Sequence, residues 1–259
     1  MKTRRLATTG AALVAAFGLA LTGCGTDGTS DTPAGNGDGA AAESSAAPAD
    51  PRAELSAAAM KLNEDSVRVE IKSSVLSGGG VMDPTAKKLD MTMDLGGQGS
   101  FRMITIDNDG YLKYTGVPGM SDKWLRLDIS KLGASGQMNL MPDGDPGGAR
   151  QLVNGVVDIE KDGDRSFSGT IDYTKAKPGD KAVEQMGEKG KAVPFTAKTD
   201  DQGRLVELVV DTSVLDQSLG KMTTTYSDFG TEVDVQKPPA AETQEAPPAL
   251  LESFGATTT

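Results

Sequence analysis

Apolar and polar residues alternate along one segment of the chain after another, and this two-residue period limits the possible folds more than any other feature. Val67, Val69 and Ile71 alternate with charged residues, and the same pattern runs from Leu89 to Leu95. Successive side chains of a β-strand point to opposite faces, so each segment is predicted to be a strand with one apolar face. We expect these strands to share a sheet that is buried on one side.

Similar patterns predict further strands, joined by short turn sequences. The predicted strands cover 101–106, 111–115, 125–129, 156–160, 166–173, 193–199, 204–211 and 221–227. Asn108-Asp109-Gly110, Lys161-Asp162-Gly163-Asp164 and Asp200-Asp201-Gln202-Gly203 are typical of hairpin turns. Strands linked by tight turns, with few helices between them, indicate an antiparallel sheet in an α+β fold. A single sheet of about nine strands would have to curl strongly.

One predicted strand changes phase along its length. Phe101 and Met103 point to one face, whereas Ile104 and Ile106 belong to the other. This change indicates either a β-bulge or a strand that is covered on both faces.

Few segments carry a helical pattern. Leu55, Ala58, Ala59 and Leu62 recur at helical spacing after Pro51, a residue that the first turn of a helix tolerates. We therefore predict one amphipathic helix over 51–63. Two shorter helices are predicted near 148–154 and 179–187.

The N-terminus has the features of a bacterial lipoprotein signal. Basic residues Lys2, Arg4 and Arg5 precede an apolar run of about 16 residues, shorter than the roughly 20 that a spanning helix needs. Leu21-Thr22-Gly23-Cys24 then matches the lipobox pattern. We expect cleavage before Cys24 and attachment of a diacylglyceryl thioether to this residue. The mature protein would be anchored to the extracytoplasmic face of the cell membrane; the export route stays open.

Composition divides the rest of the chain into a tether, a domain and a tail. Residues 24–50 hold the lipidated cysteine and then small and polar residues, which predict a disordered tether with a reach of roughly 30 Å. Residues 51–236 are predicted to form one domain, and the Pro-rich residues 237–259 a disordered tail. Leu250, Leu251 and Phe254 could instead form a docking peptide, but composition favours an unstructured end.

Charge and side-chain chemistry exclude several functional classes. The chain has 26 basic and 37 acidic residues, and its net charge falls from −11 to −14 when Lys2, Arg4 and Arg5 leave with the signal peptide. This balance argues against nucleic-acid binding. The chain has no histidine and a single cysteine, so it cannot build a Ser-His-Asp triad or an internal disulfide. We expect no enzyme activity, no cofactor and no metal site.

Several segments resemble the LppX/LprAFG lipoproteins of actinobacterial envelopes. The similar pieces are Ser66 to Ile71, Lys123 to Asp128, Asp201 to Leu208, and Thr225 to Val235 followed by Pro238. The resemblance covers most of 53–238 and implies a fold similar to LolA/LolB carriers, a strongly curved antiparallel half-barrel with helices over its concave side. It also implies that the protein holds an acyl chain of a lipid or glycolipid in an apolar cavity. We expect the protein to be a monomer.

The methionine content supports such a cavity. The chain has 11 methionines, and flexible thioether side chains suit surfaces that repack around variable apolar ligands, although a single methionine more often fills a core. A loop over 133–148 could be a lid over the entrance or simply a long loop. The residues that we assign to the cavity are Val67, Val69, Ile71, Met91, Met93, Leu95, Phe101, Met103, Leu125, Leu127, Leu208, Val210 and Met222.

Two other functions remain compatible with the sequence. The first is an anchored interaction or sensory module whose core is filled. The second is a carboxylate-dependent glycosidase, but Asp107, Asp109, Asp162, Asp164, Asp200 and Asp201 all lie in predicted turns. Aspartates in such positions more often stabilise the turn backbone than take part in catalysis.

Overall fold

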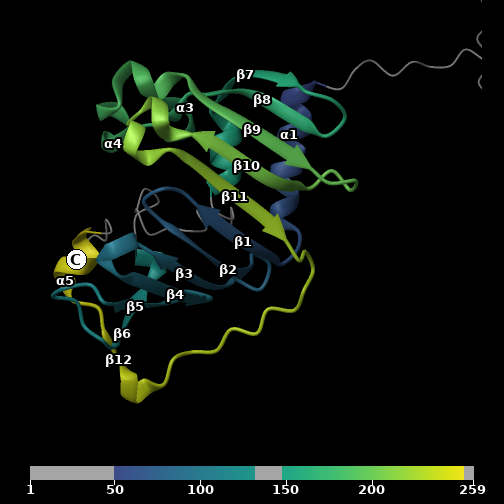
Figure 1. The fold of residues 1–259 in the computed structure, drawn as a ribbon. Helices are drawn as coiled ribbons and strands as arrows, with labels where there is room; N and C mark the ends of the chain where they lie inside the picture. Colours follow the sequence, from purple (N-terminus) through teal and green to yellow (C-terminus); the bar gives the residue numbers. More distant parts are fainter. Residues whose placement is uncertain (1–49, 132–147, 254–259) are drawn as a thin grey trace, which may run out of the picture. The chain divides into compact units, whose positions relative to one another are not determined.

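The computed structural model describes residues 50–131 and 148–253 (Figure 1). The predicted signal peptide, the lipobox with Cys24, nearly all of the tether, Phe254 and all but the last residue of the 133–148 loop lie outside the described residues. None of the helices in the described part of the chain is long and apolar enough to cross a bilayer.

The described strands form one 12-stranded sheet (Figure 1). Their order across the sheet is β12-β6-β5-β4-β3-β2-β1-β11-β10-β9-β8-β7. The strands are β1 (Val67–Lys72), β2 (Ser77–Asp83), β3 (Lys88–Asp94), β4 (Ser100–Ile106), β5 (Asp109–Thr115), β6 (Trp124–Asp128), β7 (Val156–Lys161), β8 (Ser166–Ile171), β9 (Val193–Thr199), β10 (Leu205–Asp211), β11 (Lys221–Ser227) and β12 (Thr243–Glu245).

Within the described sheet, β12 and β6 run parallel, and the other neighbouring strands are antiparallel. The predicted α+β fold with a curved, mostly antiparallel sheet is therefore confirmed (Figure 1). The helices are α1 (Pro51–Met60), α2 (Ala149–Asn154), α3 (Tyr173–Ala176), α4 (Lys181–Gln185) and α5 (Pro248–Ser253), with short 3₁₀ turns at Lys61–Asn63, Gly96–Gln98, Ile129–Lys131, Gly187–Lys191, Thr212–Val214, Gln217–Leu219 and Ala240–Glu242.

Helix α1 begins and packs as its sequence predicts. Pro51 occupies the first turn, and the side chain of Asp50 accepts a hydrogen bond from the backbone N–H of Arg52. Leu55, Ala58 and Ala59 are buried, and the helix packs against β7, β10 and α2. The helix therefore covers one face of the sheet, which we call the inner face.

The register of the sheet aligns residues of neighbouring strands in one row across the inner face. Val69 pairs with Gly80, Gly80 with Met91, and Met91 with Met103. The row continues from Met103 through Leu112 to Leu125. Residues directly opposite each other on neighbouring strands point to the same face, so the alternation seen in the sequence becomes a continuous apolar surface.

Strand β2 lies in a segment for which the alternation pattern predicts no strand. Its segment contains Gly78, Gly79 and Gly80, and glycine runs are more typical of loops than of strand interiors. The structure needs these glycines because neighbouring strands lie very close. A Cβ atom on Gly80 would lie 2.0 Å from the carbonyl oxygen of Asp90, far inside van der Waals contact. Close approach of another backbone is a recognised reason for glycine within a strand.

Strand β4 is covered on both faces, which decides between the two interpretations of its phase change. Its pairing with β3 and β5 runs without a register shift, so there is no bulge. Ile104 instead packs on the opposite, outer face with Tyr111, Trp124, Val233 and Val235. These residues form a small second core.

The β4–β5 hairpin turns one residue earlier than predicted. Strand β4 ends at Ile106 and pairs it with Asp109, which leaves Asp107 and Asn108 as the two turn residues. Asp107 has a positive φ of 55°, a conformation that short hairpins require and that aspartate tolerates. Gly110 lies within β5, where a Cβ atom would meet the side chains of Leu127 and Ile129. By contrast, the two other predicted hairpins join β7 to β8 and β9 to β10 as expected.

The structure differs from the predicted disordered tail over 237–253. This segment contains β12, which pairs with β6, and α5. Ala246 is buried, and Leu250 and Leu251 pack against the main core. These few apolar residues suffice because they meet an existing apolar surface, which composition alone does not reveal.

Candidate functional site

The predicted cavity residues lie together in the structure, with one exception. By strand register all of them except Leu95 point to the inner face. Of these predicted residues, the ones that belong to the main core are Val67, Val69, Met91, Met93, Met103, Leu125, Leu127, Leu208 and Val210, and Ile71 and Phe101 pack against it. Met222 is half-buried opposite Val210, whereas Leu95 follows the end of β3 and is half-exposed.

The centre of the inner face combines bare backbone with methionine. Gly78 and Gly80 on β2 contribute no side chain, and their partners on β3 are Met93 and Met91. A Cβ atom on Gly78 would lie 2.9 Å from the Sδ atom of Met93, so this thioether occupies the space that a side chain at 78 would take. Met103 on β4 lies directly opposite Met91. This part of the core is therefore filled by side chains with several rotatable bonds.

The inner face is closely packed in this structure. Met91 is 1% exposed and Met103 is 4% exposed. Helix α1 covers the face at β7 and β10. At the other end of the sheet, next to β6, the C-terminal residues Ala246, Leu250 and Leu251 join the same core.

The C-terminal segment passes around the β6 edge of the sheet in two parts. The outer-face segment, residues 228–237, follows β11 and places Val233 and Val235 against Trp124 on the outer face. The edge segment, residues 240–253, then adds β12 beside β6 and brings Ala246 into the main core of the inner face. The chain therefore crosses from one face of the sheet to the other at β6.

The outer-face segment is held by several contacts. The backbone N–H of Gly230 donates to the carbonyl oxygen of Ser66 at 2.9 Å, and the Ser66 hydroxyl donates to the carbonyl oxygen of Thr231. Arg68 forms an ion pair with Asp228 at 2.8 Å. Together with the buried valines, these contacts attach the segment to β1 and to the outer face.

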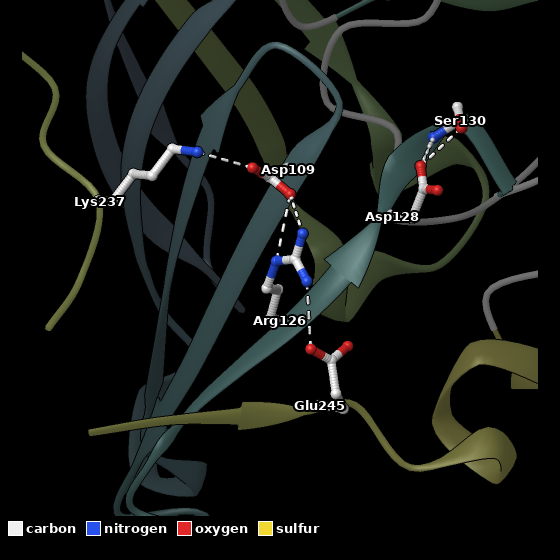
Figure 2. A network of polar contacts seen from close by, with 6 residues as sticks. All are labelled: Asp109, Arg126, Asp128, Ser130, Lys237 and Glu245. Atoms are coloured by element: carbon white, nitrogen blue, oxygen red, sulfur yellow. Dashed lines mark hydrogen bonds and ion pairs between the residues drawn. The ribbon is translucent and has the colours of Figure 1, made fainter. Parts of the chain in front are cut away.

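A polar network on the outer face connects β5 and β6 with both parts of the C-terminal segment (Figure 2). The guanidinium of Arg126 donates to Asp109 Oδ1, with an Nη2–Oδ1 distance of 2.6 Å, and to Glu245 Oε1 at 3.2 Å. Lys237 Nζ donates to Asp109 Oδ2 at 2.8 Å. Figure 2 shows the side chain of Arg126 between the two carboxylates. Asp109 thus contacts Lys237, which precedes Pro238-Pro239, and Arg126 contacts Glu245, which follows them.

These contacts change the protonation equilibria of the groups involved. The hydrogen bond from Lys237, followed by that from Arg126, holds the pKa of Asp109 below its ordinary value. The same contact with Asp109 raises the pKa of Lys237. Both shifts favour the charged forms that make the ion pair.

The network was not predicted from the sequence. Asp109 was assigned to a turn, but it lies at the start of β5 and forms ion pairs. Its partner Lys237 is 128 residues away in the chain, and Arg126 and Glu245 are separated by 119 residues. No local pattern indicates such pairs. Asp200 does serve its turn as predicted, since its carboxylate accepts from the backbone N–H groups of Gln202 and Arg204.

Within residues 50–131 and 148–253, no group of three or more acidic, histidine or cysteine side chains is placed to hold a metal ion.

Solved structures of known proteins match this chain, and LppX is one of them. The crystal structure of the Mycobacterium tuberculosis lipoprotein LppX matches with a TM-score of 0.43 and 18% sequence identity. The match covers 71% of this chain and 97% of LppX. No protein-family model matches the chain. No curated protein matches it either.

Proposed function

We propose that this protein is a membrane-anchored, extracytoplasmic lipoprotein that holds an acyl chain of a lipid or glycolipid against the inner face of its sheet. Anchoring rests on the lipobox Leu21-Thr22-Gly23 and on Cys24, the only thiol of the chain. Two or more acyl chains on such a residue give stable attachment to a bilayer. The protein would act as a monomer at the cell membrane.

The observation that carries lipid binding is the composition of the inner face around β2. Gly78 and Gly80 leave the backbone of β2 bare, the thioether of Met93 lies beside Gly78, and Met91 and Met103 continue the same face on β3 and β4. Unbranched thioether side chains can change rotamers at small cost, so they can move aside and then line a channel for a flexible apolar ligand. A core of branched side chains packed against residues larger than glycine would resist such repacking.

The energetics are adequate for a physiological ligand. Each buried methylene contributes about 0.8 kcal/mol, so about ten of them contribute roughly 8 kcal/mol before the costs of binding. Binding of this kind needs no catalytic group and few polar contacts. An acidic, histidine-free chain is compatible with it.

The proposal can be tested with purified protein and an apolar fluorescent probe. We expect the full chain to bind a pyrene-labelled fatty acid, and native mass spectrometry of protein extracted from membranes to show a bound lipid. Met103→Phe stiffens the inner face and is expected to weaken probe binding at least about tenfold. Met60→Phe is the matched control, because Met60 is 54% exposed and lies outside the core.

The close packing of the inner face favours a second candidate. Met91 is 1% exposed and Leu112 is 0% exposed, so the inner face is filled by the protein's own side chains. A filled core of this kind is compatible with an anchored interaction module that binds no lipid. In that case no probe binds, no lipid is extracted with the protein, and Met103→Phe changes only stability. These results would overturn the lipid-binding proposal.

A further inference from the structure

The two edges of the sheet are protected in different ways. At one edge, β7 carries Asp158, Glu160 and Lys161 and has a register shift after Val156. Charges and bulges are common protections for an exposed edge strand. At the other edge, β6 places Trp124 and Arg126 on the outer face and Leu125 and Leu127 on the inner face. This edge is covered by β12 instead.

The edge segment, which covers β6, is attached more weakly than the outer-face segment. Strand β12 has only three residues and runs parallel to β6, the less stable pairing geometry per residue. Gln244 and Glu245 are exposed, and the side chain of Glu245 is 77% exposed although it pairs with Arg126. Exposed ion pairs of this kind contribute little to stability. The outer-face segment, in contrast, buries Val233 and Val235, whereas among residues 240–252 of the edge segment only Ala246 is buried.

Two prolines separate the two parts. Lys237, Pro238 and Pro239 connect the outer-face segment to the edge segment. Proline has no backbone N–H to donate, so Pro238 and Pro239 cannot extend the hydrogen-bonded pairing to the neighbouring strand. The edge segment can therefore detach while Val233 and Val235 keep the preceding residues in place.

The apolar side chains of the edge segment occupy the surface that a ligand would use. Ala246 is 7% exposed and belongs to the same core as Met91, Met103 and Leu125. Leu250 and Leu251 pack against that core from outside the sheet. Apolar contacts do not depend on a particular orientation, so an acyl chain can take the place of these side chains.

We propose that residues 240–253 form a displaceable gate at the β6 edge, and that an acyl-chain ligand reaches the inner face by displacing it. The inference rests on the proposed function. The arrangement in which β12 pairs with β6 is then the closed state. Because only the open fraction of molecules accepts ligand, the apparent affinity is reduced by that fraction, and one open molecule in about ten weakens binding about tenfold.

A reversible cross-link tests the gate without changing the folded domain. Arg126 and Glu245 are opposite each other in the β6–β12 pairing. Neighbouring strands lie at a separation that a disulfide can span. We would introduce Arg126→Cys and Glu245→Cys into the full chain with Cys24→Ser, so that the new thiols are the only ones. The oxidised protein is locked closed, and the reduced protein has a freed gate.

The same sample is then measured twice with a pyrene-labelled fatty acid. We expect the oxidised protein to bind the probe at least about tenfold more weakly than the reduced protein, and the reduced protein to bind at least as tightly as the unmodified chain. The control pair is Glu160→Cys with Ser168→Cys, which are opposite each other on β7 and β8 at the far edge. Oxidation of this pair is expected to leave probe binding unchanged.

A second variant keeps the test independent of disulfide formation. Leu250→Ser with Leu251→Ser removes the apolar contacts of the gate and is expected to tighten probe binding. Equal binding by the oxidised and reduced proteins, with no effect of the double serine variant, overturns the gate and leaves lipid binding intact. Absence of probe binding by the unmodified chain and by every variant overturns the proposed function, and the gate with it.

Discussion

Asp109 at the start of β5 accepts a hydrogen bond at 2.8 Å from the ammonium group of Lys237, a residue 128 positions later in the chain. The same carboxylate accepts from Arg126, which also reaches Glu245. One aspartate thus connects two strands of the sheet with the outer-face segment and, through Arg126, with the edge segment (Figure 2). The charge of Asp109 therefore holds both parts of the C-terminal segment near the β6 edge.

Asp109→Asn should loosen the edge segment with little effect on the domain. The substitution removes the charge that orients Arg126 and holds Lys237. These groups are exposed, so we expect the free energy of unfolding to fall by less than about 1 kcal/mol. Hydrogen exchange over 243–246 should accelerate. Asp90→Asn is the matched control, because the carboxylate of Asp90 forms an ion pair with Arg102 of β4 on the outer face. Equal acceleration in both variants would contradict the assigned role of Asp109.

Acid should release the edge segment. The folded protein holds the pKa of Asp109 below its ordinary value, so this group stabilises the segment above the unfolded pKa, and the contribution is lost as pH falls through the folded pKa. We expect proteolysis after 237 to become faster as pH falls below about 4, in a range where the domain still resists cleavage. The groups that face Asp109 are Arg126 and Lys237, and neither titrates there. In Asp109→Asn this pH dependence should be reduced.

Gly80→Ala should destabilise the domain strongly. The added Cβ atom would lie 2.0 Å from the backbone oxygen of Asp90 and 2.6 Å from Cα of Met91, so β2 and β3 must separate. We expect a loss of about 2 kcal/mol or more in the free energy of unfolding, measured by urea denaturation. Gly97→Ala is the control, since nothing lies within 4 Å of its Cβ position, and it should change stability by less than about 1 kcal/mol.

Val235→Ala should weaken the outer core. The substitution removes two buried carbon atoms from the contact between the outer-face segment and Trp124, which costs about 1.5 kcal/mol. Asp234→Ala changes a neighbouring exposed residue and is expected to have almost no effect. Thermal unfolding of the two variants compares them directly. An equal loss in both would mean that Val235 does not anchor the segment.

Cys24→Ser should abolish attachment to the membrane. Serine cannot form the thioether that the proposed anchor requires, and the acidic charge of the protein gives no electrostatic binding to anionic lipid. We expect the variant in the soluble fraction after cell disruption, whereas the unmodified protein sediments with membranes. Thr22→Ser retains a small residue in the lipobox and serves as the control.

Much of the fold follows from local chemistry in the sequence. The alternation of Val67, Val69 and Ile71, and of Met91 and Met93, determined which residues point to the inner face, because side-chain direction in a strand has a fixed period of two. Helix α1 likewise follows from its apolar spacing and from Pro51 at its start. The lipobox before Cys24 is also a local pattern, and the prediction drawn from it needs no tertiary structure.

Only the tertiary structure decided the role of residues whose partners are distant in the chain. Gly78 and Gly80 form a strand because neighbouring backbones approach them closely, not because glycine favours strands. Ile104 faces an outer core that exists only once Val233 and Val235 return to the sheet. The edge segment is ordered because β6 and the main core offer it a surface, although its own composition would not order it. Local sequence determined side-chain direction, whereas contacts between distant segments determined what those side chains meet.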